Sequence, residues 1–166
     1  MMHIYCGDGK GKTTAAVGLS VRMAGSGGKV LFIQFLKGSP TGETEPLKQL
    51  GITVMRCDRE YGFWYSLDKE DRESLIKCHN KNLAYAAEHM NEFDMIVLDE
   101  LCAAYSLGAV DSAAVCDFLE SCTAELVITG RDPDSFFTER ADYISEIGKI
   151  KHPFDKGIAA RKGIEY

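Results

Sequence analysis

The chain has 166 residues, of which 45% are hydrophobic and 27% are charged, as expected for a globular protein with a buried core. Its 19 basic and 25 acidic residues give a net charge of −6, which argues against nucleic acid as a partner because nucleic-acid-binding proteins usually present a basic surface. Apolar runs are too short to span a bilayer, and the glycine-rich loop that begins at Gly7 leaves no room for a signal peptide before it. We therefore expect a cytoplasmic protein without a membrane partner.

The cysteines are scattered along the chain and form no Cys-x-x-Cys pair. They are Cys6, Cys57, Cys78, Cys102, Cys116 and Cys122. Zinc sites usually contain such close pairs, so we do not predict a zinc site. In the cytoplasm thiols stay reduced, and we expect free thiols, several of them packed as small core residues.

Short apolar runs recur along the chain without the alternation of polar and apolar residues that marks a half-exposed strand. They predict strands that are buried on both faces, as in a parallel sheet. These strands lie at 4–6, 30–35, 52–55, 95–98 and 126–129. The more polar segment 143–150 is predicted to be an edge strand.

Segments with helical spacing lie between the strands. One helix is predicted over 14–24, with Gly25 as its left-handed stop. Another is predicted over 68–91, with one apolar stripe made of Ile76, Leu83, Ala87 and Met90. Asp111 could cap a third helix, and Asp132-Pro133 has the form of a cap followed by a first-turn proline.

Strands and helices in alternation predict one α/β domain over 1–166, with a mostly parallel central sheet and helices on both faces. Two long, irregular segments, 36–45 and 57–67, follow predicted strands. Because ligands of open α/β sheets bind at the carboxyl ends of the strands, we expect both segments to form walls of a site.

The glycine-rich loop is the strongest functional signal. We expect it to bind ATP and to make this α/β domain one of the P-loop nucleotide-hydrolase type. It consists of Gly7, Asp8, Gly9, Lys10, Gly11, Lys12, Thr13 and Thr14. Glycines let backbone N–H groups converge on phosphate oxygens, Lys12 supplies charge, and the Thr13 hydroxyl suits Mg²⁺. The usual pattern would have glycine in place of Cys6, so either the loop is one residue tighter or Cys6 fills that position. A glycine-rich turn without a ligand is the alternative, which the Lys-Thr-Thr ending disfavours.

Two further motifs are expected to face the same crevice. The strand 95–98 runs into Asp99 and Glu100, carboxylates that could hold Mg²⁺ beside Thr13 or could instead cap the next helix. Arg131 follows the strand 126–129, where its guanidinium could bind phosphate oxygens or could simply lie on the surface.

Four aromatic residues gather in the loop at 61–65, including the single tryptophan of the chain. Core packing is the usual explanation for such residues. Exposed aromatics between elements also suggest contact with a large, flat, apolar partner. The sequence leaves these two interpretations open.

Several motifs together resemble the ATP:corrinoid adenosyltransferases of the P-loop type, in order and over nearly the whole chain. They are GDGKGKTTAAVGL, FIQFLKG, GFWY, DMIVLDEL, LVITGR and ADYISEIGKIKHPFDKGIAARKGIEY. The resemblance implies that Co(I) of a corrinoid attacks C5′ of ATP, takes up the 5′-deoxyadenosyl group and expels triphosphate. Lys12, Arg131, the loop amides and Mg²⁺ would then stabilise the leaving triphosphate.

The resemblance also assigns Phe63, together with Tyr65 or Trp64, to the exclusion of the lower cobalt ligand, which makes Co(I) accessible to reduced flavin or flavodoxin. It further implies a homodimer. Three departures stand out: Asp8 replaces the usual asparagine, Tyr65 takes the place of a tryptophan, and an N-terminal segment found in longer relatives is lacking. Two rival functions remain at this stage. A P-loop kinase or ATPase would release ADP, and a nucleotide-binding regulator would turn nothing over.

Overall fold

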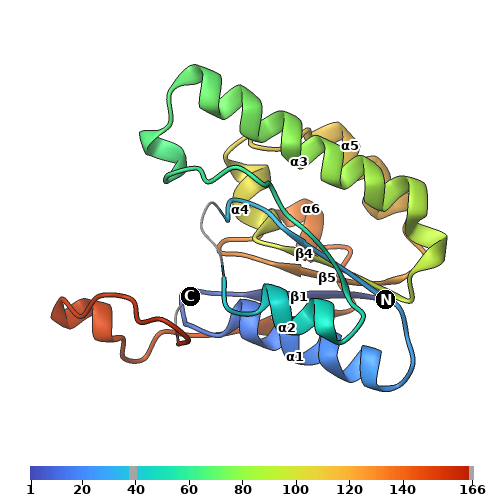
Figure 1. Cartoon of the computed structure of the whole chain (residues 1–166), viewed down its shortest axis with the longest axis horizontal. Helices are drawn as coiled ribbons and strands as arrows, with labels where there is room; N and C mark the ends of the chain where they lie inside the picture. The colour runs from blue at the N-terminus through green and yellow to red at the C-terminus, as the bar shows by residue number, and fades with distance from the viewer. Residues whose placement is uncertain (38–40, 165–166) are drawn as a thin grey trace.

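The computed structural model describes residues 1–37 and 41–164, and in these ranges a six-stranded parallel sheet forms the centre of the protein. The strand order is β3-β2-β4-β5-β1-β6 (Figure 1). The strands are β1 (Met2–Cys6), β2 (Val30–Gln34), β3 (Thr53–Met55), β4 (Met95–Asp99), β5 (Glu125–Thr129) and β6 (Tyr143–Glu146). The predicted α/β fold with a parallel sheet is confirmed.

Helices cover both faces of the sheet, as Figure 1 shows. One face carries α1 (Lys12–Gly25) and α2 (Thr44–Gln49). The other carries α3 (Lys69–His89), α4 (Leu101–Ser106), α5 (Ser112–Ser121) and α6 (Ser135–Thr138). Short 3₁₀ turns are η1 (Trp64–Ser66), η2 (Met90–Glu92) and η3 (Pro153–Lys156). None of the helices in the described ranges is long and apolar enough to cross a bilayer.

Strand β2 explains why the central strands are continuously apolar. Val30 and Phe32 pack into the cluster beneath α1 and α2, whereas Leu31 and Ile33 pack into the cluster beneath α3 to α6. All four side chains are buried because successive residues of a strand point to opposite faces. Each such burial stabilises the fold by roughly 1.5–3 kcal/mol.

Two predicted helix ends are wrong in detail. Gly25 stays within α1, and the left-handed residue is Gly27, with φ of 89°. Asp132 does not cap α6, because Asp134 is the residue whose side chain accepts the Phe136 N–H. The cap of α5 is confirmed, since Asp111 accepts the N–H groups of Ala113 and Ala114.

The buried face of α3 also differs from the predicted stripe. Its fully buried residues are Leu75, His79, Asn82, Leu83 and Ala86, whereas Ile76, Ala87 and Met90 are only partly buried. A stripe drawn through apolar residues alone passes over His79 and Asn82. His79 is buried here because its ring nitrogens have backbone partners.

The structure contradicts the expectation of free thiols for one pair. Cys57 and Cys78 form a disulfide, with their Cα atoms 6.0 Å apart, that joins the 57–67 loop to α3. A separation of 21 residues carries no local signal, and only the packing of the loop on α3 brings the two together. The other four cysteines are free.

Candidate functional site

The glycine-rich loop is one residue tighter than the usual pattern. Cys6 lies in β1, where it is in register with Glu146 of β6, so the loop proper begins at Gly7. The helix α1 begins at Lys12. Cys6 therefore does not fill the first loop position, and the tighter of the two interpretations is confirmed.

Two of the loop glycines are required by their backbone surroundings. A Cβ atom at Gly7 or Gly9 would lie 2.6 Å from the carbonyl oxygen of Ile147, and the Gly9 N–H donates to that oxygen at 2.7 Å. The segment that follows β6 thus packs directly on the loop. This contact, which was not predicted from the sequence, is a second reason for glycine at these two positions besides phosphate binding.

Lys12 bonds two carbonyl groups of the loop. Its side chain is buried, and its Nζ donates to the carbonyl oxygens of Gly7 at 2.7 Å and Gly9 at 2.9 Å. Gly11, with φ of 125°, precedes α1 and provides no side-chain cap. The first N–H groups of a helix lack intrahelical acceptors, so this end of α1 suits an anion.

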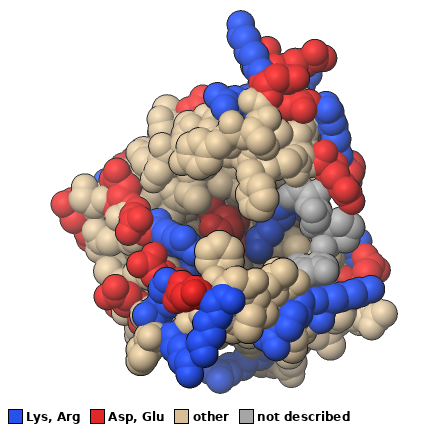
Figure 2. Space-filling model, turned by 90° about the vertical axis from the view of Figure 1, so that its left-hand side faces the viewer, with Lys and Arg blue, Asp and Glu red and all other residues tan. Residues whose placement is uncertain are grey.

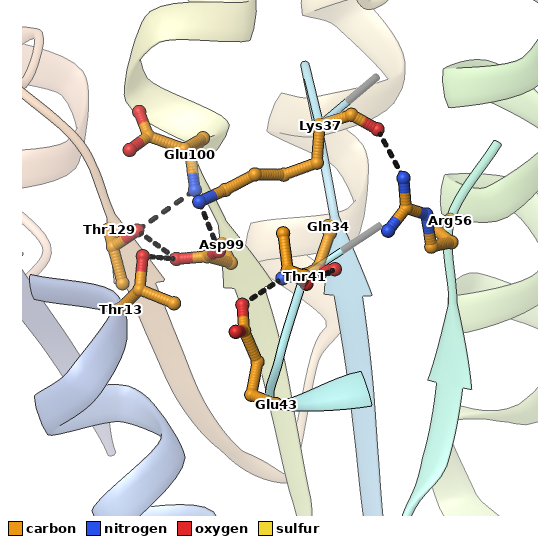
Figure 3. A network of polar contacts seen from close by, with 9 residues as sticks. All are labelled: Thr13, Gln34, Lys37, Thr41, Glu43, Arg56, Asp99, Glu100 and Thr129. Carbon is orange, nitrogen blue, oxygen red and sulfur yellow. Dashed lines mark hydrogen bonds and ion pairs between the residues drawn. The ribbon is translucent and has the colours of Figure 1, made fainter. Parts of the chain in front are cut away.

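A network of hydroxyl groups surrounds the buried carboxylate of Asp99 (Figure 3). Thr13 Oγ1 and Thr129 Oγ1 donate to the same Asp99 oxygen, Oδ1, at 2.9 and 2.8 Å. The Glu100 N–H donates to Thr129 Oγ1 at 2.9 Å. No side-chain hydrogen bond caps α4 in the described chain, so the capping alternative for the two carboxylates has no support.

Burial dominates the electrostatics of these carboxylates. It raises the pKa of Asp99, whereas the charge of Lys37 and the hydrogen bonds from Thr129 and Thr13 oppose the rise. Burial also raises the pKa of Glu100, and the negative charge of Asp99 raises it further. The positive charges of Lys37, Lys12 and Arg131 oppose this rise. The carboxylates are therefore poised beside three cations, and added positive charge would stabilise their ionised forms.

A cavity of about 680 Å³ opens above this network. Figure 2 views the carboxyl ends of the strands and shows a hollow whose floor carries both basic and acidic side chains. The lining includes most of the predicted site, namely Asp8, Gly9, Lys10, Gly11, Lys12, Thr13, Thr14, Glu100 and Arg131. Gly7 and Asp99 are not among the lining residues, but they bond to Lys12 and Thr13, which are. Residues 38–40 of the predicted wall 36–45 lie outside the described chain, and Lys37, Thr41, Gly42 and Glu43 line the cavity as expected.

The second predicted wall does not reach this cavity. Within the described lining neither Phe63 nor Tyr65 occurs, and their side chains are 89% and 82% exposed. Their neighbours are packed instead: the Tyr61 hydroxyl bonds to Ser74 Oγ at 2.8 Å, and Arg72 lies 5.3 Å from the Trp64 ring centroid. Each interpretation of the aromatic segment therefore holds for two residues: Tyr61 and Trp64 pack against the protein, whereas Phe63 and Tyr65 are exposed.

Several residues of the site had no individual role predicted from the sequence. Lys37 lies 3.9 Å from Asp99 Oδ2, and Gln34 bonds both Thr41 and Glu43. His152 and Ile164, from the segment after β6, also line the cavity. The position of Lys37 just after β2 was a usable signal, because the ends of parallel strands meet at one edge.

The parallel sheet and the glycine loop at the start of α1, with a buried aspartate facing the loop threonine, define a P-loop nucleotide-binding protein. The family model described as "ATP:corrinoid adenosyltransferase BtuR/CobO/CobP" matches residues 1–166. The chain belongs to this family of transferases, and the kinase, ATPase and regulator alternatives are not favoured.

Proteins named corrinoid adenosyltransferases match nearly the whole of this chain. The corrinoid adenosyltransferase of Escherichia coli (strain K12) is 33% identical over 168 residues, covering 98% of this chain and 84% of the relative. The corrinoid adenosyltransferase CobA of Salmonella typhimurium is 32% identical over 167 residues, with the same coverage. That of Pseudomonas aeruginosa is 32% identical over 171 residues, covering 100% of this chain and 83% of the relative.

Proposed function

We propose that this protein transfers the 5′-deoxyadenosyl group of ATP to Co(I) of a corrinoid and releases triphosphate, in the synthesis or salvage of adenosylcobalamin. The observation that carries the proposal is the match of the whole chain to the adenosyltransferase family. A cavity lined by a P-loop, two further basic residues (Lys37 and Arg131) and two further carboxylates (Glu43 and Glu100) supports it. In this reaction the C5′–O bond breaks as the cobalt–carbon bond forms, so the electron pair leaves with the triphosphate.

The phosphate-binding role falls to the loop from Gly7 to Thr14. Lys12 already turns its ammonium group toward two loop carbonyls, so phosphate oxygens that enter the loop find a preorganised donor. Arg131 lines the same cavity from the end of β5 and can bind another oxygen of the leaving group. Asp8 also lines the cavity, and its negative charge suits a contact away from the phosphates.

The donors around Asp99 fit a magnesium ion. Thr13 and Glu100 offer a hydroxyl and a carboxylate oxygen, and Asp99 orients the Thr13 hydroxyl from below. The described residues contain no group of three His, Cys, Asp or Glu side chains placed to hold a metal. Mg²⁺ needs none, because it takes most of its ligands from phosphates and water. When bound, it would neutralise part of the triphosphate charge.

The exposed pair Phe63 and Tyr65 suits the flat face of a corrin ring. We propose that these side chains exclude the lower cobalt ligand, so that reduced flavin or a flavodoxin can supply the electron that makes Co(I). We further propose a homodimer that works in the cytoplasm, where its substrate ATP is made. There the Cys57–Cys78 disulfide would be exposed to reducing thiols.

The test is incubation of the protein with ATP, Mg²⁺ and chemically reduced Co(I) corrinoid. We expect the visible spectrum of a cobalt–carbon bond, and inorganic triphosphate in equal amount. The Lys12→Ala variant should lose on the order of 10²–10³ in rate, because a charged contact to the leaving group disappears. Lys69→Ala, which removes a lysine that is 92% exposed on α3, is the matched control. ADP formed in step with turnover would overturn the proposal.

A further inference from the structure

One oxygen of the buried Asp99 carboxylate is left without a hydrogen bond. Oδ1 accepts from two threonine hydroxyls, but Oδ2 has no hydrogen-bond partner among the described residues, and the side chain is completely buried. The ammonium group of Lys37 lies 3.9 Å from Oδ2. That distance makes an ion pair but exceeds a hydrogen bond, so charge alone holds the two groups together.

Hydrogen bonds hold the backbone at Lys37, and its side chain is partly exposed. The preceding Leu36 adopts a left-handed φ of 55°, and its N–H donates to His79 Nε2 at 3.2 Å. The carbonyl oxygen of Lys37 accepts from Arg56 Nη2 at 3.0 Å. From this anchor the side chain extends across the cavity floor to Asp99, as Figure 3 shows, and it is 27% exposed. A rotation of the long lysine side chain about this anchored backbone would be enough to exchange one partner for another.

The proposed cation ligands lie beside the same carboxylate. Thr13 bonds Asp99 directly, and Glu100 is its neighbour in the chain. A divalent cation held by them would compete with the Lys37 ammonium for the charge of Asp99 and would repel it. The triphosphate would offer that ammonium a new anionic partner in the cavity that Lys37 already lines.

We propose that Lys37 is a displaceable counter-ion, which neutralises Asp99 in the nucleotide-free enzyme and moves to a phosphate oxygen when Mg·ATP binds. The inference rests on the proposed function in one respect, that the cavity takes ATP together with Mg²⁺. It gives Lys37 a positioning role in the free enzyme and a binding role in the complex.

A double-mutant cycle tests the exchange. Lys37→Met, Asp99→Asn and the double variant are unfolded thermally without ligand and again with saturating Mg·ATP, no corrinoid being present. Without ligand, we expect Lys37→Met to lower Tm by about 2–4 °C when Asp99 is present and to have little effect in the Asp99→Asn background. With Mg·ATP this coupling should vanish. Absence of coupling in the free enzyme, or its full persistence with Mg·ATP, would overturn the proposal.

A binding measurement keeps the test decisive if the Asp99→Asn variant does not fold. In calorimetric titrations of Mg·ATP, Lys37→Met should bind on the order of tenfold more weakly, because one charge-assisted hydrogen bond is lost. Lys37→Arg should keep most of the affinity. Lys48→Met is the charge-matched control, since Lys48 pairs with Glu45 on the surface of α2. Equal or tighter binding by Lys37→Met would show that no phosphate contact forms.

Failure of the proposed function can be told apart from failure of this inference. Both measurements omit the corrinoid and report only the Lys37–Asp99 pair and Mg·ATP. A protein that forms no cobalt–carbon bond but shows the expected coupling would refute the activity and keep the exchange. The opposite result would refute the exchange alone.

Discussion

Acidification should destabilise this protein through His79, which lies in α3 with its side chain only 1% exposed. Its Nδ1 lies 2.8 Å from the carbonyl oxygen of Ala109, and its Nε2 faces the N–H of Leu36 at 3.2 Å. A neutral ring with its proton on Nδ1 satisfies both contacts. Protonation of Nε2 would set two N–H groups against each other in a buried site.

The magnitude follows from the pKa values. Burial lowers the pKa of His79 from 6.5 to about 4, and the hydrogen bond to Ala109 opposes the shift only in part. Between these two values the unfolded chain binds a proton that the folded chain does not, so stability falls as the pH falls from 6.5 to about 4. At 1.36 kcal/mol per pH unit the full loss is about 3 kcal/mol. That is a large part of a typical folding free energy.

Urea unfolding at a series of pH values from 7 down to about 4 measures this loss. The matched variant is His79→Gln, whose amide can donate to Ala109 and accept from Leu36 without titrating. We expect its free energy of unfolding to fall less steeply with acid than that of the wild type, by the equivalent of one proton. His89→Gln, at the end of α3, serves as control. Parallel curves for wild type and His79→Gln would refute the reasoning.

Three further predictions concern the metal ligands, the exposed aromatic pair and the disulfide. Glu100→Gln should raise the Mg²⁺ concentration needed for half-maximal activity while corrinoid affinity holds, and overlaid Mg²⁺ titrations would contradict a metal role. Phe63→Ala should lose most activity when reduced flavin must make Co(I), but it should keep much of its activity with chemically reduced Co(I). Adding Tyr65→Ala to this variant should widen the difference between the two assays. Equal losses in both assays would contradict a role in cobalt reduction. Reduction of the Cys57–Cys78 disulfide should lower the free energy of unfolding by about 3 kcal/mol, measured in urea with and without dithiothreitol and compared with Cys57→Ser, which should not respond.

Much of the fold could be predicted because its signals are local. A strand buried on both faces must be apolar at every position, so β2 and β4 are legible as continuous runs. The loop from Gly7 to Thr14 carries its chemistry in consecutive residues. The order of these elements then implied a parallel sheet and placed Asp99, Glu100 and Arg131 at the edge where the loop lies.

Features that depend on distant segments were decided only by the tertiary structure. The rotation of α3 follows from the partners of His79, which come from the segments at Leu36 and Ala109. The disulfide likewise depends on how the 57–67 loop packs on α3. None of these contacts can be predicted from periodicity or from neighbouring residues, because each joins residues far apart in sequence.

The site also has features that the sequence predicts and features that only the tertiary structure decides. Its residue types follow from the sequence, since phosphate and magnesium demand glycine amides, a lysine, a hydroxyl and a carboxylate in known motifs. The pairing of Lys37 with Asp99 and the contact of Ile147 with two loop glycines do not, because both are made across neighbouring strand ends. The Lys37 contact matters because Asp99 is buried away from water. That burial depends on the assembled sheet.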